Sequence, residues 1–226
     1  MRRSLAFTAI LAAPILGTLA LADAAMLHRE PTRARAALHA LEDTILMGRA
    51  LVLNHDCNGC HGGRDPSSPE WLSGARTEAD AFPIGPCATQ PGAQPCFHTR
   101  PRNLTPDNAT GIGRFTERQI FNALRYGLRP EDTPDIQITS STPGQGNFPL
   151  HPHYLAPPMP WPGFRHMSDQ ELMAIATYLK HGVKPATNRV PESEGPPDFW
   201  ASAYTPDKIG AYPGPAFPAA SEQLRR

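Results

Sequence analysis

Apolar residues recur at helical spacing in three separate stretches of the chain. The stretches cover residues 34–53, 116–127 and 168–180, and Gly48 in the first stretch allows another helix to approach closely. The third stretch repeats apolar residues at intervals of three and four, which places them on one helix face: Leu172, Ile175, Ala176 and Leu179. The pattern therefore predicts few helices for a chain of 226 residues.

Capping signals mark where two of these helices begin. Thr116 is followed three residues later by Gln119, and Ser168 is followed at the same interval by Glu171. In such a capping box the hydroxyl accepts from a first-turn amide, and the Gln or Glu side chain reaches back to the amide of the cap. Gly127 comes at the end of the middle pattern and can terminate that helix.

The remaining segments lack sustained periodicity because proline and glycine are abundant. The chain has 27 Pro and 18 Gly, and they gather in residues 62–110, 130–162 and 191–226. Proline fixes its own backbone angle and restricts the preceding residue, so these segments are expected to be stiff connections. We predict a loop insertion at 62–110 and an irregular, Pro-rich C-terminal tail at 191–226.

The first 24 residues have the pattern of an export signal. Arg2 and Arg3 precede a nearly continuous apolar run from Leu5 to Leu21, and small residues follow at Ala22 and Ala24. An uncleaved anchor in the inner membrane is the alternative, because this run is near the ~20 residues of a spanning helix. No later run approaches that length, so residues 25–226 are expected to be periplasmic and without a membrane span.

Charge excludes one broad class of partner. Lys and Arg number 21, and Asp and Glu also number 21, so the formal net charge is zero. Proteins that bind nucleic acid or anionic membranes through electrostatics need a strong basic excess. We therefore expect no nucleic-acid partner.

Hydrophobic residues make up 40% of the chain, which predicts a small core organised by a cofactor.

The chemistry of the chain is concentrated in one five-residue motif, Cys57-Asn58-Gly59-Cys60-His61. Two cysteines separated by two residues can bond to the two vinyl groups of one haem, and the adjacent histidine can then ligate the iron. This C-x-x-C-H pattern is typical of c-type haem attachment. Its position after an export signal and a predicted helix favours the same interpretation.

Two readings without haem use the same cysteines. A zinc site would combine Cys57 and Cys60 with Cys87 and Cys96, but eight residues separate the second pair rather than two to four. A thioredoxin-like dithiol would require a strand before Cys57, and no strand pattern precedes it. In an oxidising compartment Cys87 and Cys96 are instead expected to form a disulfide.

Three blocks of the sequence resemble the exported, single-haem, class I cytochromes c of bacterial electron transfer. The resemblance covers roughly residues 41–190. The blocks are Gly48-Arg49 with Cys57-Asn58-Gly59-Cys60-His61, then Asn103-Leu104-Thr105-Pro106-Asp107 with Gly111-Ile112-Gly113, and last Met159-Pro160-Trp161 with Met167-Ser168-Asp169.

This resemblance implies an all-α cytochrome c fold in residues 25–190. Helices 41–53 and 168–180 would cross with one covalent haem c between them, His61 as one axial ligand and a methionine of the preceding loop as the other. The long segment between His61 and Met159 and the extra cysteine pair depart from the family pattern. Partner specificity is therefore not inherited from the resemblance.

The sixth iron ligand determines the function because a thioether raises the potential and a second histidine lowers it. Met159 occupies the family's ligand position and is bracketed by prolines, which leave it little conformational freedom to lose. Met167 and Met173 are better explained by packing of the third helix, and His151 and His153 are the rivals. The full set of candidates is Met159, Met167, Met173, His98, His151 and His153.

Two further side chains are candidates for contact with the haem. Trp161 is expected to shield the haem face, with ordinary core packing as the alternative. Arg102 is expected to pair with a haem propionate through parallel hydrogen bonds, with a solvated loop charge as the alternative.

The sequence therefore predicts an electron carrier whose haem iron cycles between ferric and ferrous states. Its expected partners are redox proteins, namely a donor dehydrogenase and a terminal oxidase or another cytochrome. With both axial positions filled it would not itself be an enzyme, although it could be the cytochrome subunit of one. A haem protein with an open sixth position and an exported zinc or thiol protein are the alternatives.

Overall fold

The computed structural model describes residues 17–211 and 213–223, and it gives side-chain surroundings from residue 33 onward. The predicted export signal at residues 1–24 lies mostly outside this part of the chain. The chain divides into two compact units, Met1–Glu42 and Asp43–Arg226. In its described part the first unit consists of the beginning of one long helix, and the second contains every other element.

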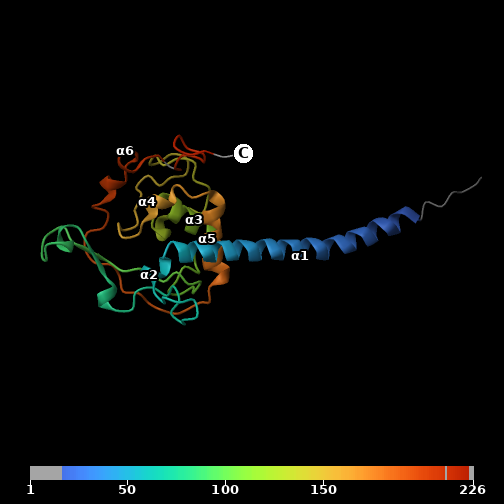
Figure 1. Cartoon of the computed structure of the whole chain (residues 1–226), viewed down its shortest axis with the longest axis horizontal. Helices are drawn as coiled ribbons and strands as arrows, with labels where there is room; N and C mark the ends of the chain where they lie inside the picture. Colours follow the sequence, from blue (N-terminus) through green and yellow to red (C-terminus); the bar gives the residue numbers. More distant parts are fainter. Residues whose placement is uncertain (1–16, 212, 224–226) are drawn as a thin grey trace, which may run out of the picture. The chain divides into compact units, whose positions relative to one another are not determined.

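Short helices and turns make up the second unit (Figure 1). The long helix α1, Gly17–Asn54, runs on into this unit and is longer than the helix predicted at 34–53. The remaining α-helices are α2 Cys57–His61, α3 Glu117–Tyr126, α4 Trp161–Phe164, α5 Asp169–Thr177 and α6 Pro206–Ile209, and short 3-10 turns lie between some of them. The prediction of few helices is confirmed, and long irregular connections separate them.

Both predicted capping boxes are present. The Thr116 hydroxyl accepts from the Gln119 amide at 3.1 Å, and α3 ends at Gly127 with φ 65°. The Ser168 hydroxyl accepts from the Glu171 amide at 3.2 Å and starts α5. Beyond Thr177 the helix widens into a π-helical turn, Tyr178–Gly182, so the predicted helix 168–180 ends in a different geometry.

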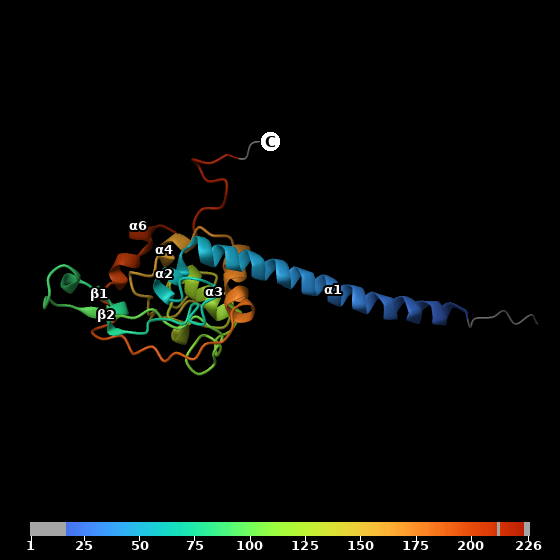
Figure 2. The ribbon, with the colours of Figure 1, turned by 60° about the horizontal axis from the view of Figure 1, so that its bottom comes forward.

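A small antiparallel sheet lies within residues 62–110 and was absent from the predicted all-α fold. It pairs β1, Phe82–Ile84, with β2, Phe97–Thr99, so that Phe82 faces Thr99 and Ile84 faces Phe97 (Figure 2). Each strand is three residues long, too short for the alternation of apolar and polar residues to reveal it.

Two hydrophobic clusters form the core of the second unit, a large one and a small one around Leu128. Helices α3 and α5 pack against each other, and a side chain on Gly48 of α1 would overlap the Ala174 backbone and Tyr178. The predicted close approach of a second helix at Gly48 is therefore confirmed. Largest among the fully buried side chains are Trp161, Leu72, Leu128 and Leu172.

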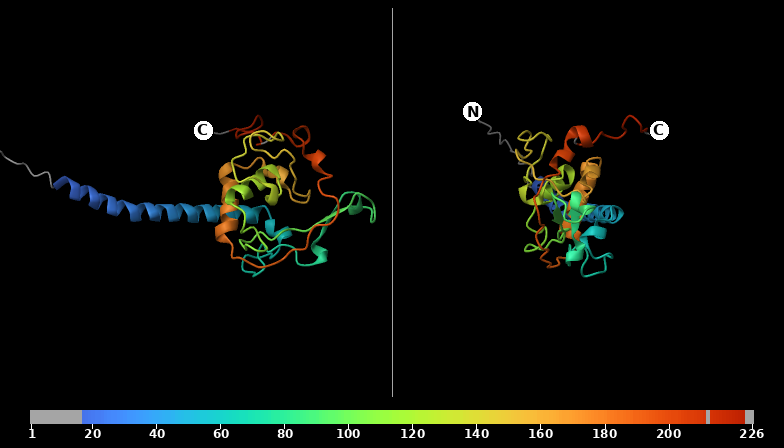
Figure 3. Two further views of the ribbon diagram at one scale, coloured as in Figure 1. Left: turned by 180° about the vertical axis from the view of Figure 1, so that it is seen from behind. Right: turned by 90° about the vertical axis from the view of Figure 1, so that its left-hand side faces the viewer.

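The C-terminal segment contributes to this core although its sequence is irregular. Val190, Trp200 and Tyr204 are each less than 9% exposed. Figure 3 shows the segment passing beside the β1–β2 hairpin, where Glu194 forms an isolated antiparallel bridge with His98. Within the described residues, no helix combines the length and the apolar character needed to cross a membrane.

Candidate functional site

The C-x-x-C-H motif forms a short helix of its own directly after α1. Asp56 precedes α2 in a left-handed conformation, φ 50°, and Gly62 follows it with φ 86°. Asp56 thus separates α2 from α1, and Gly62 ends α2. A side chain on Gly59, the second of the two residues between the cysteines, would overlap the Asp56 carboxylate, which would then have to move. Cys57 is half-buried and Cys60 is exposed.

Cys57 and Cys60 are free thiols, not joined to each other. Burial raises the pKa of the Cys57 thiol to about 11. A redox-active dithiol depends on a lowered cysteine pKa, because the thiolate is the attacking species. The environment of Cys57 therefore argues against the dithiol reading of this motif.

The His61 imidazole is held by a backbone carbonyl. Its Nδ1 lies 2.7 Å from the carbonyl oxygen of Arg102. Because a carbonyl only accepts, Nδ1 carries the proton and Nε2 keeps the lone pair. Burial lowers the pKa of His61, which favours the neutral ring. A neutral imidazole with one nitrogen fixed by a carbonyl is the usual form of a metal-ligating histidine.

Two distant segments frame His61 through backbone hydrogen bonds. The Gly74 amide donates to the His61 carbonyl at 2.7 Å, and the Leu72 amide donates to Gly62 at 3.0 Å. The Leu104 amide in turn donates to the Leu72 carbonyl at 2.8 Å. The frame therefore joins residues 72–74 and 102–104 to the end of α2. The sequence gives no signal for this role of Leu72, because Leu72 lies in a segment without apolar periodicity.

Met159 reaches the same hydrophobic cluster as Cys57. Both side chains are partly buried against it, and the fully buried Trp161 belongs to the cluster as well. The Met159 amide donates to the Ala156 carbonyl at 2.9 Å, which closes a turn in the segment between the prolines. The structure thus brings three of the predicted site residues, Cys57, Met159 and Trp161, to one apolar region.

Residues 154–161, which contain Met159 and are called the methionine loop below, are hydrogen-bonded to the end of α3. The Leu155 amide donates to the Gly127 carbonyl at 2.7 Å, and a side chain on Gly127 would overlap the Trp161 ring. Tyr154 stacks on Trp161 with 5.9 Å between ring centroids, and Tyr204 meets Trp161 edge-on at 4.8 Å. This packing restricts the backbone on both sides of Met159.

The other methionine candidates for the sixth ligand share the surroundings of Met159, whereas His98 and His153 do not. Met167 and Met173 are partly buried in the same cluster as Met159, at the start of α5 and within it. His98 lies on β2 with its ring 3.9 Å from the Cys96 sulfur. His153 pairs with Asp132 at 2.9 Å. Sharing the cluster does not distinguish the three methionines, but it separates them from His98 and His153.

The side chain of Arg102 binds the C-terminal segment. Its guanidinium donates to the Pro191 carbonyl at 3.0 Å and to the Glu192 carboxylate at 2.7 Å. These bonds leave the predicted propionate contact without support from the geometry. The part of Arg102 that reaches the site is its carbonyl, which the sequence could not single out because every residue carries one.

Cys87 and Cys96 form a disulfide, as the sequence analysis expected. The bond occupies both sulfurs, so these residues are unavailable to a zinc site with Cys57 and Cys60. The four cysteines therefore divide into one bonded pair in the hairpin and one free pair in α2.

The side chains at α2 fit the covalent attachment of haem. Two thiols at the required spacing precede an imidazole. Its Nδ1 is hydrogen-bonded to a carbonyl, and the Nε2 lone pair takes no part in that bond. A thioether and a buried tryptophan share the adjoining apolar cluster. Imidazole and thioether are the ligand pair of cytochromes c, and the apolar surroundings suit a porphyrin.

No protein-family model matches the chain. Three relatives are the cytochrome c subunit of quinone alcohol dehydrogenase from Komagataeibacter europaeus, that of gluconate 2-dehydrogenase from Pantoea cypripedii, and the cytochrome subunit of fructose dehydrogenase from Gluconobacter japonicus. Identity is 35% over 83 residues, 25% over 169 and 27% over 171, respectively. The matches cover 37%, 71% and 75% of this chain, but only 14%, 30% and 27% of those proteins. The chain thus spans less than a third of the relatives' length, and its similarity to them confirms the resemblance to bacterial cytochromes c.

Proposed function

We propose that the chain is a c-type cytochrome that transfers electrons, with haem c bound through Cys57 and Cys60. His61 and Met159 would be the axial ligands, and the haem supplies a reversible change between ferric and ferrous iron. The observation that carries the proposal is the 2.7 Å hydrogen bond between His61 Nδ1 and the Arg102 carbonyl. It leaves Nε2 as the ligating atom, on the residue that directly follows Cys60 in the chain.

His61 contributes more than a lone pair. Donation from Nδ1–H to a carbonyl increases the basicity of the imidazole and fixes the orientation of the ring. The Gly74 amide, which donates to the His61 carbonyl, restrains the backbone of the same residue. The ring and the backbone are thus held separately, so the ligand needs little rearrangement when the iron changes its charge.

Met159 supplies the soft ligand in this proposal. A neutral thioether opposite imidazole favours ferrous iron and raises the potential. Trp161, Trp71 and Leu72 surround the site with apolar atoms and are each at most 6% exposed. Apolar surroundings disfavour the additional charge of the ferric state, so they act in the same direction as the thioether.

The proposal also includes domain boundaries and a cellular location. Residues 25–190 would form a cytochrome c fold around one haem, and residues 1–24 would be a signal or an inner-membrane anchor. The partners would be redox proteins of the periplasm, and a dehydrogenase is the first choice because the relatives are named as cytochrome subunits of dehydrogenases. With both axial positions filled the chain would carry electrons without acting on a substrate itself.

Intact mass under denaturing conditions tests the proposal. The chain is exported from a host that attaches haem, and the expected result is an increase of one haem mass that survives denaturation. The Cys57→Ala/Cys60→Ala variant should lose this increase, whereas the matched Cys87→Ser/Cys96→Ser variant should retain it. An unmodified wild-type chain would overturn the proposal.

The spectrum of the same holoprotein tests the sixth ligand. A low-spin ferric spectrum with a methionine-to-iron charge-transfer band, and slow cyanide binding, is expected if Met159 ligates the iron. A high-spin spectrum with immediate binding of carbon monoxide by the ferrous form would instead indicate an open sixth position, and with it a ligand-binding or enzymatic haem protein.

A further inference from the structure

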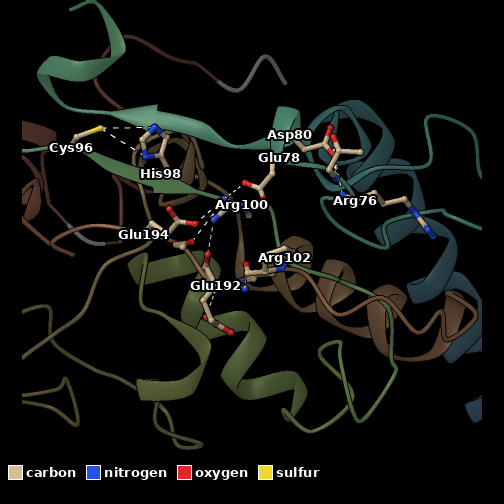
Figure 4. Close-up of polar contacts among 12 residues, drawn as sticks. Arg76, Glu78, Asp80, Cys96, His98, Arg100, Arg102, Glu192 and Glu194 are labelled. Carbon is tan, nitrogen blue, oxygen red and sulfur yellow. Dashed lines mark hydrogen bonds and ion pairs between the residues drawn. The ribbon is translucent and has the colours of Figure 1, made fainter. Parts of the chain in front are cut away.

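Residues 186–194 form a strap that runs along residues 98–105 (Figure 4). At one end the amides and carbonyls of His98 and Glu194 exchange hydrogen bonds of 2.7 and 2.9 Å. At the other end the Asn103 side-chain amide donates to the Ala186 carbonyl at 2.8 Å, and the Thr105 hydroxyl donates to it at 3.1 Å. The strap is therefore tied at both ends to the segment that contains Arg102.

Arg100 anchors the Glu194 end of the strap from the interior. Its side chain is 3% exposed, and it donates to the Glu192 carbonyl at 2.6 Å and to the Glu194 carboxylate at 3.1 Å. It also pairs with Glu78. A buried guanidinium needs such partners because an unpaired buried charge is costly. Arg100 thus holds the strap against the loop around Glu78.

Arg102 connects this strap to the candidate iron ligand. Its guanidinium donates to Pro191 and Glu192 of the strap, while its own carbonyl accepts from His61 Nδ1. The Arg102 side chain and its carbonyl are therefore held by two different segments of the chain. A shift of the strap at Pro191 and Glu192 is transmitted through one residue to the carbonyl that orients the His61 ring.

We propose that the strap, acting through Arg102 and Glu192, positions the Arg102 carbonyl and so sets the strength of its hydrogen bond to His61. This inference rests on the proposed function, since it concerns the same axial histidine. Arg102 and Glu192 are positioning residues, because neither side chain contacts the imidazole. Through this hydrogen bond the strap contributes to the reduction potential of the haem.

The direction of the effect follows from ligand basicity. A loosened carbonyl accepts a weaker hydrogen bond, the imidazole becomes a poorer electron donor, and the ferric state loses more stabilisation than the ferrous state. Loosening the strap at Arg102 should therefore raise the reduction potential. The Arg102–Glu192 pair is exposed, with 45% and 89% of the two side chains accessible, so its loss should hardly change the free energy of unfolding.

The test compares two arginines with similar exposure. Arg102→Met keeps an unbranched apolar side chain but removes the hydrogen-bond donors of residue 102 to the strap, and Arg102→Lys restores one donor. Arg114→Met is the control, because Arg114 pairs with Glu131 at 3.0 Å with 47% and 60% of the two side chains exposed, away from the strap. The measurements are the reduction potential of the purified holoprotein and amide hydrogen exchange in residues 186–194.

We expect Arg102→Met to raise the potential and to accelerate exchange in the strap. Arg102→Lys should return both toward wild type, and Arg114→Met should change neither. Glu192→Gln, which keeps the strap's carbonyls, should shift the potential in the same direction by a smaller amount, and it serves as the test if Arg102→Met does not accumulate. A potential equal to that of the Arg114→Met control, in a protein with covalent haem, would overturn the inference alone. Absence of covalent haem from the wild type would overturn the proposed function as well.

Discussion

The indole Nε1 of Trp71 donates a buried hydrogen bond of 3.0 Å to the hydroxyl of Tyr178. Trp71 lies in the loop that follows the C-x-x-C-H motif, and Tyr178 begins the π-helical turn after α5. The two residues are 107 positions apart, so this bond joins the motif's loop to the end of α5. A side chain on Gly48 of α1 would also meet Tyr178, which places the tyrosine where both helices meet the loop.

Tyr178→Phe should destabilise the holoprotein by about 1–3 kcal/mol, because the indole donor of Trp71 would stay buried without its acceptor. Denaturant unfolding of the haem-loaded protein measures the difference. In a Trp71→Phe background the donor is gone, so the same substitution should cost markedly less. Equal costs in the two backgrounds would show that the loss does not come from this hydrogen bond.

Gly127→Ala should destabilise the protein by about 2 kcal/mol or more and disturb the methionine loop. Gly127 has φ 65°, and a Cβ there would overlap the Trp161 ring, so backbone strain and steric overlap add. Gly163→Ala is the matched control, because a Cβ on Gly163 meets no atom within 4 Å. Thermal unfolding and the methionine-to-iron charge-transfer band are the measurements. A Gly163→Ala protein as unstable as Gly127→Ala would refute the explanation by contact with Trp161.

The sequence was most informative where residues carry a local signal. The helix starts at Thr116 and Ser168 were predicted because a capping box lies within four residues of chain. The close approach at Gly48 was predicted for a similar reason, since it depends on the absence of one side chain. Each of these features depends on one residue or on residues a few positions apart, so it can be predicted from the sequence.

The features that the sequence missed depend on contacts between distant residues. Trp71, Trp200 and Tyr204 belong to the core, yet they lie in segments with no apolar period to mark them. Arg102 was singled out for its guanidinium, whereas its carbonyl contacts His61. A backbone carbonyl has no signature in the sequence, so only the path of the chain could reveal that role.

Asp107 should make stability depend on pH in the acidic range. Hydrogen bonds from the Thr110 side chain and amide, and from Thr187, hold the pKa of Asp107 below its usual range. A carboxylate with a depressed pKa stabilises the fold above its unfolded pKa of about 3.9, and this contribution is lost as the pH falls through the folded value. Wild-type stability should therefore decrease on acidification from about pH 5 downward.

Asp107→Asn removes this titration. The variant should be less stable than wild type at neutral pH, and the difference should shrink as the pH falls toward about 3. Denaturant midpoints across this range measure it, with Asp43→Asn on the exposed surface of α1 as the control. A difference between wild type and Asp107→Asn that stays constant with pH would contradict the role of the charged carboxylate.

Met159→Ala should separate haem attachment from axial ligation. The thioether bonds from Cys57 and Cys60 do not involve Met159, so covalent haem should remain at the wild-type level. Loss of the soft ligand should lower the reduction potential by on the order of 0.1 V, a fraction of the ~0.8 V that axial ligands span. It should also let carbon monoxide bind the ferrous form rapidly. Met167→Ala and Met173→Ala remove thioethers of the same cluster and should leave both properties near wild type. If one of these variants instead shows the lower potential and rapid binding while Met159→Ala does not, the sixth ligand belongs to that methionine.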